Sequence, residues 1–280
     1  MSLPLPRSLS PSKVSAFRDC ALAFRFSAID HLEEPPSPHT TKGSLVHRAL
    51  ERLFWNHDPG ARAPAVARAE LDAAWEEFVD SGELAALGLA DDEERGFRAD
   101  AADLVEGYLR LEDPDTVTTM GVEVTLEADI GGLLLRGIID RLDVDEDGEL
   151  IVVDYKTGRV PSVNQENQRL GGVQFYALLC EQVLGRRPAK VRLMYLREPV
   201  CIESDPSEQT VRGIRRRTEA VWTAIERACA AEDFRPRPSA LCGWCSFKAL
   251  CPAFGGNPAL AASWPLSSTT AEPAALSPTG

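Results

Sequence analysis

The chain has no run of about 18 apolar residues, the length that a membrane-crossing helix requires. Its first residues, 1–7, contain no sustained apolar stretch and so do not resemble a secretory signal. The sequence also lacks an internal repeat, a Gly-Lys-Thr loop for nucleotide phosphates and any helicase motif. We therefore expect a cytoplasmic protein with no membrane partner, and any motor that works with it has to be another chain.

Basic residues are fewer than acidic ones. The chain has 43 acidic and 30 basic side chains, a net charge of -13, which argues against a protein that coats nucleic acid. It does not exclude a nuclease, because nucleic-acid binding depends on local clusters of cations. Candidate clusters lie at residues 186–192, 215–217 and 235–237, and the alternative for each is a solvated helix surface.

The sequence from residue 137 to 158 is the part most informative about chemistry. Asp140 and Asp154 each follow an apolar run that is typical of an interior strand, and the acidic turn at 145–149 predicts a hairpin between them. Side chains alternate along a strand, so Asp154 and Lys156 point to the same face. In a hairpin, Asp140 on the neighbouring strand comes close to both.

Two carboxylates and one lysine on a sheet face can hold a hard divalent cation, Mg²⁺ or Mn²⁺, and place a positive group beside it. That chemistry suits cleavage of phosphodiesters. The alternative is a solvated edge strand with an ordinary acidic turn. The apolar flanks favour the metal site, since buried carboxylates are costly unless they are paired or metal-bound.

These segments resemble the RecB-like branch of the P-D-(D/E)-x-K nuclease superfamily, whose two strands read G-x-x-D and D-Y-K-T-G. Residues 43–47, Gly-Ser-Leu-Val-His, match the G-x-x-x-H motif that precedes them in this family. The family also has a downstream Gln and Tyr, usually four residues apart on one helical face. Here Gln174 and Tyr176 are two apart, so they cannot share a face. The resemblance covers about residues 9–254.

By this resemblance the fold is α/β, a restriction-endonuclease-like mixed sheet flanked by helices. The implied catalytic residues are Asp140, Asp154, Lys156, Gln174 and Tyr176. The implied metal ligands are His47, Asp140, Asp154 and the carbonyl of Tyr155. Many members carry a further acid upstream of the first aspartate, which makes Glu123 an accessory candidate.

The function that the resemblance implies is a metal-dependent DNA nuclease, an exonuclease acting on single strands or DNA ends in repair or recombination. Its expected cofactor is Mg²⁺ or Mn²⁺, and its expected partner is DNA, with a separate helicase or repair subunit as a further candidate. One alternative is a nuclease-fold DNA-binding or scaffold subunit with little activity of its own. Another is a zinc-stapled protein unrelated to nucleic acid.

Four of the seven cysteines have the spacing of a metal site: Cys242, Cys245 and Cys251 lie close together, and Cys20 stands far upstream. Disulfides are disfavoured by the odd total and the missing signal peptide, whereas zinc held by thiolates remains open. The pattern resembles the iron–sulfur staple of RecB-like nucleases such as the AddB nuclease domain and the CRISPR spacer-acquisition nucleases. That resemblance implies a structural 4Fe–4S cluster on these four cysteines. The remaining cysteines, Cys180, Cys201 and Cys229, lie in apolar patterns typical of a core.

Apolar periodicity predicts the order of the elements. Helices are expected at about residues 8–27, 41–55, 62–81, 91–112, 168–184 and 207–231, and strands at about 116–128, in the hairpin, at 190–196 and at 200–203. We expect one nuclease domain over residues 1–255, with a helical insertion at about 60–112 and a cysteine segment, 242–251, packed with Cys20. Residues 256–280, rich in Pro, Ala, Ser and Thr, are expected to form a disordered tail.

Overall fold

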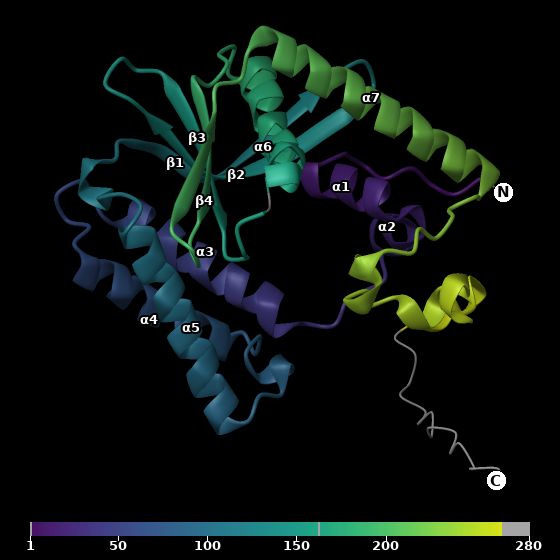
Figure 1. The fold of residues 1–280 in the computed structure, drawn as a ribbon, viewed down its shortest axis with the longest axis horizontal. Coiled ribbons are helices and arrows are strands. Elements are labelled where there is room, and N and C mark those ends of the chain that lie inside the picture. Colours follow the sequence, from purple (N-terminus) through teal and green to yellow (C-terminus); the bar gives the residue numbers. More distant parts are fainter. Residues whose placement is uncertain (1, 162, 265–280) are drawn as a thin grey trace.

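A five-stranded sheet with the order β1-β2-β3-β4-β5 lies at the centre of the computed structural model, which describes residues 2–161 and 163–264 (Figure 1). The strands are β1 (Thr119–Asp129), β2 (Leu134–Val144), β3 (Leu150–Lys156), β4 (Lys190–Tyr195) and β5 (Val200–Ser204). Strands β3 and β4 run parallel, and the other neighbouring pairs are antiparallel. The mixed sheet expected from the sequence is confirmed, including the β2–β3 hairpin.

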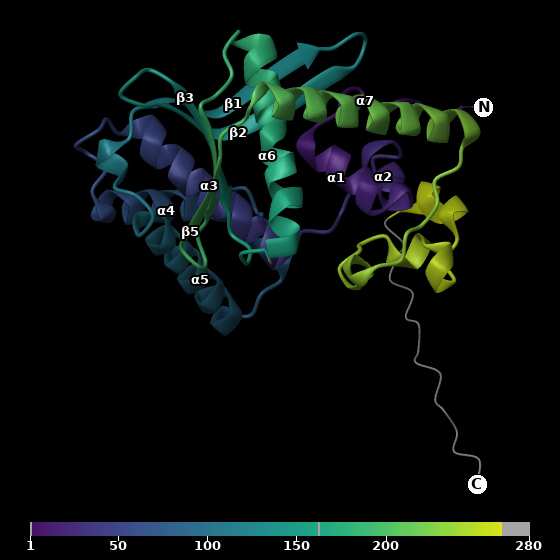
Figure 2. The ribbon, with the colours of Figure 1, turned by 45° about the horizontal axis from the view of Figure 1, so that its top comes forward.

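Helices cover both faces of this sheet (Figure 2). One face carries α3 (Pro38–Asn56), α4 (Pro64–Asp80) and α5 (Asp91–Leu109), and the other carries α1 (Pro11–Asp19), α2 (Ala21–Ala28), α6 (Val163–Val183) and α7 (Glu208–Ala231). Side chains of β3 alternate between two apolar cores: Ile151 and Val153 join the core with α3–α5, and Val152 joins the core with α6. Helix α4 and helix α5 fall within the predicted insertion, whereas α6 begins five residues before the predicted helix.

The first predicted helix is divided in two at Cys20. This residue has an extended backbone, with φ -160° and ψ 109°, and it ends α1 and precedes α2. The apolar pattern continues across the break, so periodicity did not reveal it. The backbone amide of Arg237, from the far end of the chain, lies 3.5 Å from the Cys20 Sγ. The interruption therefore presents the cysteine to a segment more than 200 residues away.

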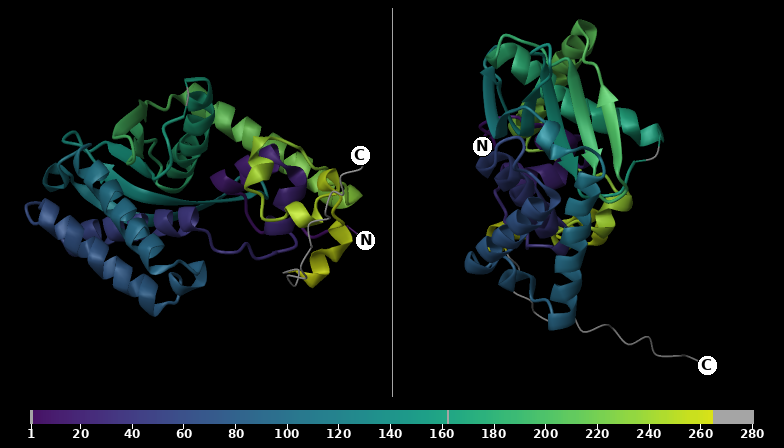
Figure 3. Two further views of the ribbon diagram at one scale, coloured as in Figure 1. Left: turned by 60° about the horizontal axis from the view of Figure 1, so that its bottom comes forward. Right: turned by 90° about the vertical axis from the view of Figure 1, so that its left-hand side faces the viewer.

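The segment after α7 folds back onto the first helices (Figure 3). The Phe247 ring packs on Phe26 with centroids 5.5 Å apart, and the indole of Trp264 donates a 2.6 Å hydrogen bond to the carbonyl of Glu33. A short 3₁₀ helix, Pro258–Ser263, precedes Trp264. The described residues 256–264, which the sequence assigns to the start of the tail, thus contain a short helix and an aromatic contact. Residues 265–280 lie outside the described residues.

No helix within residues 2–161 and 163–264 combines the length and the apolar character needed to cross a bilayer.

Candidate active site

Ligand atoms from three elements meet beside the hairpin. His47 of α3, Glu123 of β1 and Asp140 of β2 each offer one such atom, and the three atoms lie within 4.8 Å of one another. The Nδ1 of His47 is 3.5 Å from the Oδ2 of Asp140, which also accepts a 2.7 Å hydrogen bond from the backbone amide of Tyr155. One imidazole and two carboxylates form a donor set suited to Mn²⁺ or Mg²⁺. The residues present therefore fit a divalent cation.

Glu123 joins this group through an unusual backbone conformation. Its φ is 47°, in the left-handed region that non-glycine residues rarely adopt. Strand β1 also has an irregularity in its pairing with β2 between Thr119 and Gly121. Such irregularities twist a strand and redirect its side chains. The sequence made Glu123 only an accessory candidate, because regular alternation does not reveal a local change of φ.

Asp154 and Lys156 form an ion pair on β3, next to this group. Asp154 is only 6% exposed, and burial raises the pKa of its carboxyl to about 6, an increase that Lys156 opposes and the Asp140 charge adds to. Burial alone would lower the pKa of Lys156, but the attraction of Asp154 raises it above its ordinary value. Lys156 therefore carries a full positive charge at neutral pH beside a carboxyl that titrates near pH 6.

Protons compete with a cation for the three-residue group. Burial raises the pKa of Glu123 to about 7, and the neighbouring charge of Asp140 adds to this increase. Burial would lower the pKa of His47, but its hydrogen bond to Asp140 and the charges of Asp140 and Asp154 raise it above the ordinary value. Metal ligands bind in their deprotonated forms. Cation binding at this group is therefore expected to release protons near neutral pH.

The structure brings Tyr176 to the site but not Gln174. Tyr176 is buried, and burial together with the charges of Asp154 and Asp140 raises the pKa of its hydroxyl. Its ring lies against the backbone of Gly137: a Cβ at that position would be 2.9 Å from the ring. Gln174, two residues earlier on α6, instead donates a 3.1 Å hydrogen bond to Ser204 on β5. The two-residue spacing sends these side chains in different directions, as helix geometry requires.

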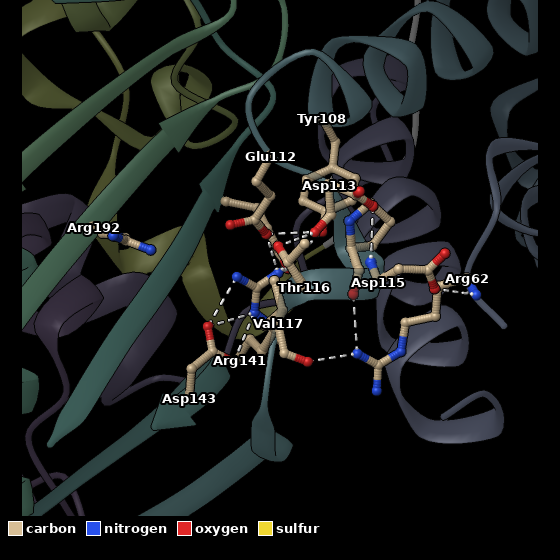
Figure 4. A network of polar contacts seen from close by, with 12 residues as sticks. Arg62, Tyr108, Glu112, Asp113, Asp115, Thr116, Val117, Arg141, Asp143 and Arg192 are labelled. Carbon is tan, nitrogen blue, oxygen red and sulfur yellow. Dashed lines mark hydrogen bonds and ion pairs between the residues drawn. The ribbon is translucent and has the colours of Figure 1, made fainter. Parts of the chain in front are cut away.

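A buried arginine contacts the site through Tyr155. Arg141 of β2 is fully buried and forms ion pairs with Glu112 at 2.6 Å and Asp143 at 2.9 Å (Figure 4). Its Nη1 also donates a 2.7 Å hydrogen bond to the hydroxyl of Tyr155. The Tyr155 ring in turn meets the His47 ring edge to face, with centroids 5.9 Å apart. This network fixes Tyr155, whose amide holds Asp140.

Cysteines from both ends of the chain surround one cavity of about 220 Å³. The four that line it are Cys20, Cys242, Cys245 and Cys251. The amides of Arg237 and Ser239 lie 3.5 and 3.3 Å from the sulfurs of Cys20 and Cys242. Within the described residues, the group of His47, Glu123 and Asp140 is the one set of three or more potential ligand atoms that all lie within 4.8 Å of one another, so no three of these sulfurs do.

The other three cysteines behave as the sequence predicted. Cys180 and Cys229 are buried, and Cys201 is partly buried. Burial raises the pKa of Cys180 to about 12 and that of Cys201 to about 11, and it also raises the pKa of Cys229. Thiols with raised pKa values in apolar surroundings are poor nucleophiles and poor metal ligands. These positions therefore serve packing.

A cleft of about 1230 Å³ leads away from Asp154 and Lys156. Its walls come from α1, the first half of β2, α6 and the residues that precede the cysteine segment. Tyr176 and Gly137 line the cleft together with the ion pair. The cleft therefore borders both the Asp154–Lys156 pair and the residues just before the cysteine segment.

Comparison with known proteins agrees with this geometry. The family described as the PD-(D/E)XK nuclease superfamily matches residues 8–252, nearly the whole described chain. The chain belongs to the PD-(D/E)XK nuclease superfamily, and its sheet with flanking helices is the restriction-endonuclease-like fold.

Individual relatives are more distant. The Gene 69 protein of Mycobacterium phage D29 is 30% identical over 139 residues, which are 49% of this chain and 49% of that protein, so the chain spans about half the length of the curated relative it matches. A candidate exonuclease from Eubacterium rectale has a similar fold, with a TM-score of 0.51 and 13% identity over 85% of this chain and 86% of that one. The crystal structure of SSO0001 aligns with this chain at 19% identity and a TM-score of 0.35. The alignment covers 83% of this chain and 92% of the SSO0001 chain.

Proposed function

We propose that this protein is a metal-dependent deoxyribonuclease, an exonuclease that acts on single strands or DNA ends during repair or recombination. The observation that most supports this is the meeting of His47, Glu123 and Asp140 beside the Asp154–Lys156 ion pair, at one end of a large cleft. A purely structural role would not explain why a histidine, three carboxyl groups and a lysine converge there. Buried groups of this kind are costly to retain without chemistry to perform.

His47, Glu123 and Asp140 would hold Mg²⁺ or Mn²⁺, with Asp154 and the carbonyl of Tyr155 as the further ligands expected from the sequence. A cation bound there would lower the pKa of a water molecule and stabilise negative charge on the phosphate. The imidazole favours Mn²⁺, because nitrogen donors suit softer ions than Mg²⁺. Asp140 is held ready for this task by the amide of Tyr155.

The remaining side chains act on the substrate and the water. The ammonium of Lys156 would stabilise the charge that develops on the phosphate oxygens or orient the attacking water. Asp154, with a pKa of about 6, is ionised at neutral pH, and its ion pair with Lys156 orients the ammonium. Tyr176 keeps its proton because its pKa is raised, so its hydroxyl can donate a hydrogen bond to a phosphate oxygen.

Cleavage of labelled single-stranded DNA and of duplexes with Mg²⁺ or Mn²⁺ tests this function. We expect mononucleotides or short products with the wild-type protein and none with Asp154→Asn. The matched control is Asp147→Asn, which removes an exposed carboxylate from the hairpin turn and should leave the rate unchanged. A protein that binds DNA but releases no product with either cation would instead be the DNA-binding or scaffold subunit considered above.

We also propose that the four clustered cysteines hold a 4Fe–4S cluster with a structural role. The four cysteines line one cavity, at the positions that the family resemblance assigns to the cluster. The two amides directed at sulfurs match the hydrogen bonds that tune iron–sulfur sites. Such a cluster would tie the start of α2 to the C-terminal segment.

A further inference from the structure

We propose that the cleft beside Asp154 and Lys156 binds one strand of nucleic acid along its phosphate backbone and leads it from the carboxylates toward residues 236–241. The proposal rests on the nuclease function proposed above and adds the path of the substrate and the side chains that bind it. Four side chains from three separate parts of the sequence carry the proposal: Lys13, Arg18, Arg136 and Arg237.

The charge of the cleft opposes the charge of the whole chain. The chain carries a net charge of -13, yet the charged residues that line the cleft are Lys13, Arg18, Arg136, Lys156 and Arg237 against Asp19 and Asp154. Asp154 is already paired with Lys156. Cations concentrated in a cleft of an acidic protein attract a polyanion there and keep it away from the remaining surface.

Two of these cations lie close enough to repel each other. Burial lowers the pKa of Lys13, and the positive charge of Arg136 adds to the decrease. They are held near each other because Leu9 pairs with Leu135 in an isolated parallel bridge, which places the start of α1 beside β2. An anion between the two side chains would relieve the repulsion. Phosphate groups of a strand provide anions at regular intervals.

The far wall of the cleft is attached to α1 through Arg237. The Nη1 of Arg237 donates a 2.9 Å hydrogen bond to the carbonyl of Arg18, and both side chains are exposed to solvent. This bond ties the segment that carries Arg237 to the C-terminal part of α1, so residues from both segments line the same cleft. The lining thus carries positive charge beside the catalytic group, at Lys156, and on the wall formed by these two segments, at Arg18 and Arg237.

Exposed apolar side chains in the same cleft indicate a single strand. Ile138 is 41% exposed and Leu241 is 56% exposed, and both line the cleft. A duplex buries the faces of its bases in the stack and offers mainly phosphates to a protein. A single strand also offers base faces, which pack on apolar and aromatic surfaces. A cleft that combines cations with exposed apolar groups therefore suits the unpaired strand.

Two of the three cation clusters expected from the sequence lie outside the cleft, whereas Arg237 of the third lines it. Arg192 donates a 2.7 Å hydrogen bond to Glu203, and Arg215 pairs with Glu219 on the same helix at 3.2 Å. The cleft therefore takes one cation, Arg237, from a cluster visible in the sequence, and the fold adds Lys13, Arg18 and Arg136 from other parts of the chain.

Fluorescence anisotropy with a labelled single-stranded DNA oligonucleotide, in buffer without divalent cations, tests the proposal. The variants are Arg18→Ala and Arg136→Ala, both at exposed positions, and the controls are Arg212→Ala and Arg215→Ala on α7. The controls match Arg136→Ala because each removes one exposed arginine and one surface ion pair. Each cleft variant should weaken binding about two- to fivefold, the effect of one exposed charge contact. The slope of log K against log salt should fall by about 0.7 per variant.

Two outcomes would overturn the proposal: cleft variants that bind as tightly as the controls, or a blunt duplex that binds as tightly as the single strand. Because no divalent cation is present, the result does not depend on cleavage. Cleft-dependent binding without any nuclease activity would keep this inference and reject the proposed reaction. If the protein cleaves DNA but its binding is unchanged by Arg18→Ala and Arg136→Ala, the proposed reaction stands and this inference is rejected.

Discussion

The backbone amide of Tyr155 donates a 2.7 Å hydrogen bond to the Oδ2 of Asp140, at the point where the backbone pairing of β2 with β3 stops. The last paired residues are Arg141 and Val153. Beyond them the strands separate, and the carboxylate of Asp140 takes the place of a backbone carbonyl. This bond orients the Asp140 carboxylate toward His47 and ties it to β3.

The first prediction separates the charge of Asp140 from its structural bond. Asp140→Asn keeps an oxygen for the amide of Tyr155 but removes the negative charge, so Mn²⁺ affinity should fall while the melting temperature of the cation-free protein changes little. His47→Ala should also weaken Mn²⁺ binding, and excess Mn²⁺ should restore part of the activity. Isothermal titration calorimetry measures the Mn²⁺ affinity of both variants. A His47→Ala protein with unchanged affinity and a lower melting temperature would indicate a packing role only.

The second prediction concerns the ammonium of Lys156. Lys156→Ala should reduce the cleavage rate by about a hundredfold or more, because one preorganised electrostatic contact to the transition state has effects of this size. The control Lys190→Ala removes a lysine at the start of β4 that pairs with Glu203 of β5 and does not line the cleft, so it should have no such effect. Single-turnover cleavage rates at saturating Mn²⁺ compare the two variants with the wild-type protein. Near wild-type activity of Lys156→Ala would reject the assignment.

The third prediction is a dependence of stability on pH. The folded, cation-free protein has a Glu123 pKa of about 7, raised from 4.5. Between these values the folded state holds a proton that the unfolded state has released, so stability falls as pH rises through this window. Glu123→Gln should flatten this decrease relative to wild type in urea denaturation at pH 5 and pH 7.5. Parallel pH profiles for the two proteins would contradict the raised pKa.

The fourth prediction concerns the cysteine cavity. Protein purified without oxygen should be brown and contain iron and sulfide in equal amounts, and Cys20→Ser should lose the colour and unfold at a lower temperature, because energy from metal binding is folding energy. The controls Cys180→Ser, Cys201→Ser and Cys229→Ser should keep the colour. A colourless protein with stoichiometric zinc would replace the cluster with a zinc site and leave the nuclease proposal intact.

The fifth prediction compares two glycines on α5. A Cβ on Gly107 would lie 1.8 Å from the backbone oxygen of Leu196, whereas a Cβ on Gly96 meets nothing within 4 Å. Gly107→Ala should destabilise the protein by about 1–3 kcal/mol or more, because backbone must move to accept it. Gly96→Ala should stabilise it by roughly 0.5–1 kcal/mol, since alanine favours a helix. Urea unfolding of both variants gives the values, and equal effects would contradict the close approach.

The sequence by itself determined the parts of this protein that depend on neighbouring residues. Apolar periodicity of 3.6 or 2 reports which side of a helix or strand is buried, so it correctly predicted α5, β1 and the β2–β3 hairpin. It also placed Asp154 and Lys156 on one strand face, since residues two apart always share one. The α/β fold followed from the order of these elements and from the motifs that resemble a known family.

Tertiary structure alone decided which distant side chains meet. The left-handed φ of Glu123 and the extended backbone of Cys20 are local conformations that periodic patterns do not encode. The hydrogen bond of Gln174 to Ser204 follows from how α6 lies on the sheet. Likewise, Lys13, Arg136 and Arg237 form no cluster in the sequence and share a cleft only because the N-terminal segment pairs with β2 and the C-terminal segment returns to α1. Contacts between residues far apart in the chain depend on register and packing of whole elements, and no local pattern specifies these.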